Sequence, residues 1–309
     1  MKIKTIFSVA ALLCLLTGCG NDNMDFPSEE NIMTTTDILT SKTDMQSTSE
    51  IISEEPQIND ITNTQKEFSF YRDHMKIYGR IFLPDGDGIF PCVIISSDLG
   101  REYKAYEAYA SAFASEGVVS VIFDCTGAVV PSNSGGKVID MTAQTEKADI
   151  LTVVSNIMDM PQINSKGIFL MGDGFGCNTA IYAAAEKPDM IKGVILAEPA
   201  FDFSDNLKQL FPDGTEIPSL LEDPFYIGKD FITEQLSSDI FELMPRFKKN
   251  VLIMSDAADE NKLKYSEKAH VSFPSAILMS VKDLNGNVSR TKNQKVIDET
   301  LRFVKANKS

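Results

Sequence analysis

The chain has 309 residues, of which 43% are hydrophobic and 24% are charged, a composition ordinary for a globular protein. Its formal net charge is −15, and no segment carries the basic stripe that neutralises phosphates, so nucleic-acid binding is excluded. The five cysteines show neither the paired spacing of a zinc site nor a CxxC motif. The sequence therefore indicates no metal site and no cofactor.

The N-terminus has the features of a lipoprotein signal peptide. Lys2 and Lys4 precede an apolar run over residues 6–16, which is too short to span a bilayer. The run ends in Leu16-Thr17-Gly18-Cys19, which resembles a bacterial lipobox, where a small residue precedes the cysteine that is lipidated. We expect residues 1–19 to be this signal and Cys19 to anchor the protein to the extracytoplasmic face of a bacterial cell membrane. The alternative is an ordinary secretory signal with an incidental cysteine.

Residues 20–65 differ in composition from the rest of the chain. They hold ten acidic residues against Lys42 alone, are rich in Ser, Thr and Asn, and have no sustained apolar period. Such a segment cannot bury enough apolar surface to offset its ordering entropy. We therefore expect residues 20–65 to be a disordered acidic tether.

From residue 66 the pattern changes to alternating strands and helices. Two alternating segments, Phe68–Tyr71 and Met75–Leu83, predict an antiparallel hairpin. Continuous apolar runs predict buried parallel strands at Cys92–Ile95, Val118–Phe123, Gly167–Met171, Ile191–Ala197, Val251–Met254 and Ala276–Val281. Helical segments are predicted at Tyr103–Ser115, Thr142–Met158, Gly176–Ala185, Leu263–Ser272 and Lys292–Ala306. This order predicts an α/β domain over residues 66–309 with a mostly parallel, doubly wound sheet.

One interval breaks the alternation. Residues 202–248 are too long for a simple crossover and contain Pro, Asp and Gly between short apolar helical patches. We expect this segment to be a small cap inserted over the carboxyl edge of the sheet, where ligands bind in such folds.

The sharpest local pattern is a strand, a turn and an Ala-rich helix around Gly172-Asp173-Gly174-Phe175-Gly176. This is the setting of the G-x-S-x-G nucleophile elbow, in which small flanking residues let the turn close. Gly174 then occupies the nucleophile position. Moving the frame by one to make Asp173 the nucleophile would put Met171 and Phe175 at positions that must be small. A dinucleotide-binding loop is disfavoured because these glycines come late in the fold.

The domain resembles a known family. Residues 66–309 are similar to bacterial carboxylesterases of the feruloyl (cinnamoyl) esterase group in the α/β-hydrolase superfamily. The resemblance rests on Val93-Ile94-Ile95-Ser96, Phe123-Asp124, the elbow segment, Glu186-Lys187-Pro188-Asp189, Pro199-Ala200-Phe201 and Val251-Leu252-Ile253. It implies the α/β-hydrolase fold and a site built for ester hydrolysis.

The resemblance also assigns roles that this chain fills only in part. It implies that the backbone N–H groups of Leu99 and Phe175 form an oxyanion hole and that Asp259 matches the catalytic acid. The family's histidine falls at Asn287. The family's two His-Gly turns are replaced by Ser97-Asp98 and Ser255-Asp256.

The census of histidines does not depend on that alignment. The chain has two histidines, and none follows His270. We expect His74 in the hairpin turn and His270 on the surface of a helix, so neither can deprotonate a nucleophile. A Ser-His-Asp mechanism therefore lacks two of its three members, and the loss of one typically costs about 10⁴–10⁶-fold in turnover.

Three aspartates follow predicted strands, and two readings of them are open. Asp98, Asp173 and Asp256 are expected at the carboxyl edge of the sheet, with Asp259 and Glu198 nearby. They would form an acidic pocket for a cation, or they are present because Asp suits turns through bonds to nearby backbone.

These features predict a catalytically inactive esterase homologue that acts in binding or scaffolding. Its partners would be the membrane, through Cys19, and a small ligand such as an ester, an aromatic acid or a sugar. The alternatives are an ester hydrolase that uses Asp173, Cys177 or an activated water, with or without a metal, and a purely structural surface protein. The candidate pocket residues are Asp98, Leu99, Asp173, Phe175, Glu198 and Asp256.

Overall fold

The computed structural model describes residues 57–60, 65–222, 225–281, 284 and 292–308. The expected signal peptide with Cys19 and most of the expected tether lie outside these residues, as does Asn287. Within the described part of the chain, no helix is both long and apolar enough to cross a bilayer.

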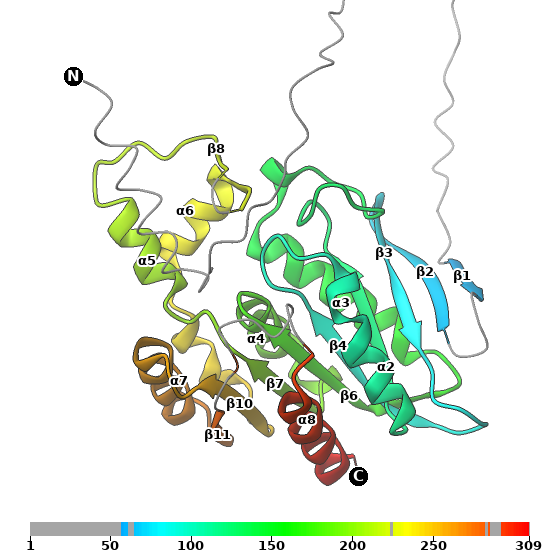
Figure 1. Ribbon diagram of the computed structural model, residues 1–309. Helices are drawn as coiled ribbons and strands as arrows, with labels where there is room; N and C mark the ends of the chain where they lie inside the picture. Colours follow the sequence, from blue (N-terminus) through cyan, green and yellow to red (C-terminus); the bar gives the residue numbers. More distant parts are fainter. Residues whose placement is uncertain (1–56, 61–64, 223–224, 282–283, 285–291, 309) are drawn as a thin grey trace, which may run out of the picture.

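The centre of the described domain is a nine-stranded sheet in the order β1-β2-β3-β5-β4-β6-β7-β10-β11 (Figure 1). The strands are β1 (Gln57–Asp60), β2 (Gln65–Arg72), β3 (Met75–Phe82), β4 (Phe90–Ser96), β5 (Val119–Asp124), β6 (Ile163–Asp173), β7 (Gly193–Ala197), β10 (Val251–Asp256) and β11 (Ala276–Val281). The pairs from β5 to β11 are parallel, and the pairs among β1, β2, β3 and β5 are antiparallel. The predicted mostly parallel, doubly wound sheet is confirmed.

Helices cover both faces of this sheet. One hydrophobic cluster joins a sheet face to α2 (Glu107–Ser115) and α8 (Gln294–Asn307). The other joins the opposite face to α3 (Ala143–Met158), α4 (Gly176–Glu186) and α7 (Glu260–Ser272). Side-chain caps start three of these helices, because Thr142, Asp259 and Asn293 each accept a bond from a backbone N–H of the first turn. Short 3₁₀ segments are η1 (Tyr103–Tyr106), η2 (Val138–Asp140) and η3 (Pro188–Met190).

The segment between β7 and β10 has its own small elements. It contains α5 (Phe203–Leu210), the two-stranded pair β8 (Leu220–Leu221) and β9 (Ile227–Gly228), α6 (Lys229–Ser237), η4 (Ile240–Glu242) and η5 (Met244–Arg246). Figure 1 shows α5, α6 and β8 as a group set apart from the helices that flank the sheet. We call residues 202–248 the cap.

Strand β1 corrects the boundary of the expected tether. It lies inside residues 20–65 and pairs antiparallel with β2, from Gln57 opposite Ser69 to Asp60 opposite Lys66. The expectation of disorder is therefore wrong at residues 57–60. The segment can form a strand because backbone hydrogen bonds to a neighbouring strand do not require an apolar pattern, and the expectation of disorder was based on the absence of that pattern.

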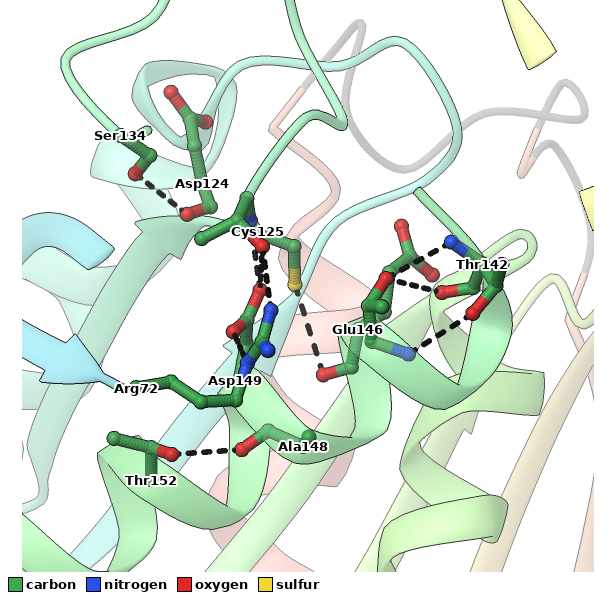
Figure 2. Close-up of polar contacts among 11 residues, drawn as sticks. Arg72, Asp124, Cys125, Ser134, Thr142, Glu146, Ala148, Asp149 and Thr152 are labelled. Carbon is green, nitrogen blue, oxygen red and sulfur yellow. Dashed lines mark hydrogen bonds and ion pairs between the residues drawn. The ribbon is translucent and has the colours of Figure 1, made fainter. Parts of the chain in front are cut away.

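A buried polar cluster fastens the antiparallel hairpin to α3. The Arg72 Nε lies 2.5 Å from Asp149 Oδ1, and the other Asp149 oxygen accepts bonds from the backbone N–H and hydroxyl of Thr126. Figure 2 shows the Arg72 and Asp149 side chains meeting beside Cys125, with Glu146 one turn earlier on α3. Because Asp149 is fully buried, its charge depends on these donors.

Candidate functional site

The turn between β6 and α4 has the geometry that its glycines predict. A Cβ added to Gly172 would lie 2.4 Å from the Cα of Cys177, and one added to Gly176 would lie 2.3 Å from the Ser96 carbonyl oxygen. Gly174 between them has a φ of +54°, in the left-handed region that L side chains rarely adopt. The chain therefore makes a tight, sharply bent turn at the carboxyl end of a central strand.

The carboxylate of Asp98 occupies the space beside Gly174. A Cβ on Gly174 would lie 2.1 Å from Asp98 Oδ1, so a side chain at position 174 and this carboxylate exclude each other. The same oxygen accepts a 2.8 Å bond from the backbone N–H of Phe175. The Leu99 N–H also lies close enough to the carboxylate to lower its pKa. Both donors expected of an oxyanion hole thus face a carboxylate of the protein itself.

A buried tyrosine joins Asp98 to the acid at the end of β6. The backbone N–H of Asp98 donates to the Tyr106 hydroxyl at 3.0 Å, and that hydroxyl donates to Asp173 Oδ2 at 2.9 Å. Burial, and then the nearby charge of Asp98, raise the pKa of Asp173 to about 8. Burial also raises the pKa of Asp98, while the Phe175 and Leu99 N–H groups lower it. The pair therefore holds a proton near neutral pH, and these donors favour Asp98 as the ionised member.

A lysine supplies the positive charge for this acidic region. Glu198 is 1% exposed and has a φ of +51°, and its Oε2 lies 3.7 Å from the Nζ of Lys262. Burial raises the pKa of Glu198 to about 7. The charge of Lys262 also lowers the pKa values of Asp98 and Asp173. Among the described residues no three His, Cys, Asp or Glu side chains are grouped as a metal site would require.

Two of the predicted site acids serve local turns. Asp256 Oδ1 accepts a 2.9 Å bond from the N–H of Ala258, two residues on. Asp259, aligned with the family's acid, caps α7 by accepting a 2.9 Å bond from the N–H of Lys262. The bond to Asp256 is of the kind that the turn reading describes, whereas Asp259 serves as a helix N-cap. The aligned histidine position, Asn287, lies outside the described residues.

Among the described residues, no histidine and no reactive thiol lies at the elbow. His74 lies in the β2–β3 turn and His270 on α7, and both are exposed, as the sequence predicts. Cys177 is fully buried, and its thiol donates to the Ala197 carbonyl at 3.4 Å. Burial raises the pKa of that thiol well above its usual range. Asp173 is 1% exposed, so neither alternative nucleophile is open to a substrate.

The cap closes over the elbow. The ring of Phe175 packs against Phe203 of α5, with centroids 4.9 Å apart, and against Phe231 of α6, at 5.1 Å. All three rings are buried. The sequence pointed to the elbow and to Asp98, Leu99 and Phe175, which the structure brings together. It did not indicate Tyr106, because nothing in the sequence distinguishes its hydroxyl from those of Tyr103 and Tyr109 in the same segment. It did not indicate Lys262, because a lysine in a polar helix normally signals a surface position.

Gly174→Ser tests the exclusion between position 174 and Asp98. We expect a loss of unfolding free energy of about 3 kcal/mol, from the left-handed backbone and the overlap with the carboxylate. Gly117 is a matched control, because its φ is +81° and a Cβ there meets nothing within 4 Å. Gly117→Ser should cost only about 1 kcal/mol in urea unfolding. Adding Asp98→Ala should recover part of the larger loss, and no recovery would contradict the assigned contact.

The raised pKa of Asp173 predicts a pH dependence of stability. The folded protein holds a proton on Asp173 up to about pH 8, whereas an unfolded Asp releases it near 3.8. This stabilisation is complete below about pH 4 and is lost as pH rises to 8. Asp173→Asn keeps an acceptor for Tyr106 and should flatten the fall in unfolding free energy between pH 5 and 8 by about 4 kcal/mol. Asp85→Asn, at an exposed turn, is the control. Parallel pH curves for wild type and Asp173→Asn would refute the assignment.

No protein-family model matches the chain, and no curated protein matches it. Solved structures do. The ferulic acid complex of Est1E from Butyrivibrio proteoclasticus superposes with a TM-score of 0.68 at 20% identity, covering 77% of this chain and 98% of that one. The α/β hydrolase GrgF from Penicillium sp. sh18 gives 0.66 at 18% identity, with 79% and 99% covered.

A third solved structure, an acetyl xylan esterase from Paenibacillus sp. R4, gives a TM-score of 0.62 at 13% identity, with 82% of this chain and 88% of that one covered. At these identities the likeness concerns the fold and not the activity. The match covers 88–99% of these three solved structures, and the order of the sheet agrees with it: this chain has the α/β-hydrolase fold.

Proposed function

We propose that this protein is a lipid-anchored, extracytoplasmic member of the α/β-hydrolase superfamily that is catalytically inactive and acts in binding or scaffolding. The observation that carries the proposal is the position of the Asp98 carboxylate. It lies against Gly174, where a nucleophile would stand, and accepts the Phe175 N–H that would stabilise an oxyanion. A negative charge at that point disfavours the negative charge that develops during ester hydrolysis.

The chemistry of the neighbouring residues supports the same proposal. Gly174 has no side chain to attack a substrate, and the two histidines are exposed in the β2–β3 turn and on α7. Asp259 uses its carboxylate to cap a helix. An ester hydrolase with a substitute nucleophile is the competing function. Its candidates, Asp173 and Cys177, are buried, and the raised pKa of Cys177 leaves its thiol protonated.

The anchoring part of the proposal rests on the N-terminal sequence. Lys2, Lys4, the short apolar run and Leu16-Thr17-Gly18-Cys19 have the order of a lipoprotein signal. Each buried methylene of a lipid adds about 0.8 kcal/mol of membrane affinity, so two or three acyl chains give a firm anchor. The acidic segment that follows would separate the domain from an anionic surface, because like charges repel.

The first experiment measures ester hydrolysis. The purified chain is incubated with p-nitrophenyl acetate and methyl ferulate, and we expect turnover no faster than that of a heat-unfolded sample. Gly174→Ser should also be inactive, because neither histidine lies near position 174 and the Asp98 carboxylate beside it opposes the developing oxyanion. Saturable turnover that Asp173→Asn or Cys177→Ser abolishes, and that Asp85→Asn retains, would establish the competing hydrolase instead.

The second experiment tests the anchor. In bacterial cells fed labelled palmitate, the wild-type chain should carry label and stay with membranes until detergent is added. Cys19→Ser should carry no label, because the acceptor thiol is gone. Cys14→Ser is the matched control, since this cysteine lies inside the signal and should leave labelling intact. Label that persists in Cys19→Ser would exclude the proposed anchor.

A further inference from the structure

A small cavity lies between the cap and the helix that follows the elbow. Its volume is about 50 Å³, and its walls come from α4, α5, α6, η4 and α7. None of Asp98, Gly174 and Phe175 lines it. An inference about this cavity therefore stands apart from the proposed loss of catalysis.

One wall of the cavity presents an acceptor without a donor. Asn178 of α4 is 3% exposed, and its Nδ2 donates to the Ala200 carbonyl at 3.1 Å. Because Ala200 offers only an acceptor there, the amide must keep its nitrogen on that side, which fixes the opposite position of Oδ1. The Oδ1 has no hydrogen-bond partner among the described residues. A buried carbonyl oxygen left in this state costs free energy unless something donates to it.

The side chain of Gln235, on α6, complements it. This residue is 2% exposed and lines the same cavity, and its Nε2 has no acceptor at hydrogen-bonding geometry within the described part of the chain. The Tyr182 hydroxyl donates to Ser238 at 3.4 Å and lies near enough for the Gln235 amide to lower its pKa, but it does not reach hydrogen-bonding geometry with Nε2. The Gln235 amide carries two N–H groups, so one of them is open to the cavity even beside Tyr182. The cavity thus offers a buried acceptor from α4 and a buried donor from α6.

The rest of the lining indicates an uncharged ligand with an apolar part. Two lysines, Lys208 and Lys268, are balanced by two aspartates, Asp205 and Asp239. The Lys268 Nζ is engaged 3.7 Å over the Phe241 ring, and Lys208 pairs with Asp205 at 3.2 Å. The rings of Phe201 and Phe241, with centroids 5.8 Å apart, supply an apolar surface.

We infer that this cavity binds a small uncharged amide, such as an N-acetyl group, which donates its N–H to Asn178 and accepts from Gln235. An amide carries one donor and one acceptor, which is the complement of the two unpaired groups. About 10–15 Å³ accommodates one water-sized group, so the cavity of about 50 Å³ holds roughly three to five heavy atoms, the size of an acetamide or N-methylacetamide molecule. The methyl group lies against the aromatic rings.

The test uses two probes of the same shape. N-methylacetamide offers both hydrogen-bonding groups, whereas methyl acetate lacks the N–H that Asn178 needs. Each is titrated into the full chain while the side-chain amide signals of Asn178 and Gln235 are followed by ¹⁵N NMR. N-methylacetamide should shift both signals and bind about tenfold more tightly than methyl acetate, the effect of one hydrogen bond.

Variants separate this site from others. Gln235→Glu replaces the donor with an acceptor and should abolish the shift of the Asn178 signal. Gln209→Glu makes the same change at an exposed position of α5 and should leave binding unchanged. If Gln235→Glu does not fold, the comparison of the affinities of the two probes for the wild-type chain still tests the inference. Equal affinities of the two probes would overturn the inference, and so would shifts confined to the backbone signals of Leu99 and Phe175. No shift of the Asn178 and Gln235 signals would also overturn it and would mean that only water fills the cavity.

Discussion

The contact between the Asp98 carboxylate and the turn at Gly174 determines what this site can do. The φ of +54° at Gly174 favours a glycine, and the carboxylate excludes a side chain there because it lies where a Cβ would be. The bond from the Phe175 N–H holds the carboxylate in place and uses a donor that a hydrolase would reserve for its oxyanion. The β6–α4 turn thus keeps the geometry of a nucleophile elbow, but the Asp98 carboxylate lies where a nucleophile and an oxyanion would be.

Placing that anion near other buried acids has electrostatic consequences. Asp173 and Glu198 lie nearby and are almost fully buried, and burial raises the pKa of each toward or above neutrality. Two features of the chain limit the repulsion. Tyr106 joins Asp98 to Asp173, and the charge of Lys262 offsets that of the acids. A resident lysine thus supplies the positive charge that a bound cation would have brought to the predicted acidic pocket.

Much of the fold could be predicted from local pattern. For the strand Ala276–Val281, the predicted and observed ends are the same. The sequence also locates the elbow, because glycines at alternate positions between a strand and an Ala-rich helix are typical of that tight turn. Strand β1 was missed, since its pairing with β2 lies in backbone bonds that side-chain composition does not reveal. Lys262 was missed because only the packing of α7 buries it.

The sequence alone determined which chemical groups this protein possesses: no serine in the elbow, no histidine after His270, and a lipobox-like Leu16-Thr17-Gly18-Cys19. Which side chains a protein contains is set by its covalent sequence and does not depend on how the chain folds. Only the tertiary structure decided that Asp98 accepts the Phe175 N–H, that Asp259 caps a helix, and that Asn178 and Gln235 line one cavity. These relations join residues far apart in the chain. They depend on how sheet, helices and cap pack, because burial sets both the charge state of an acid and the cost of an unpaired amide.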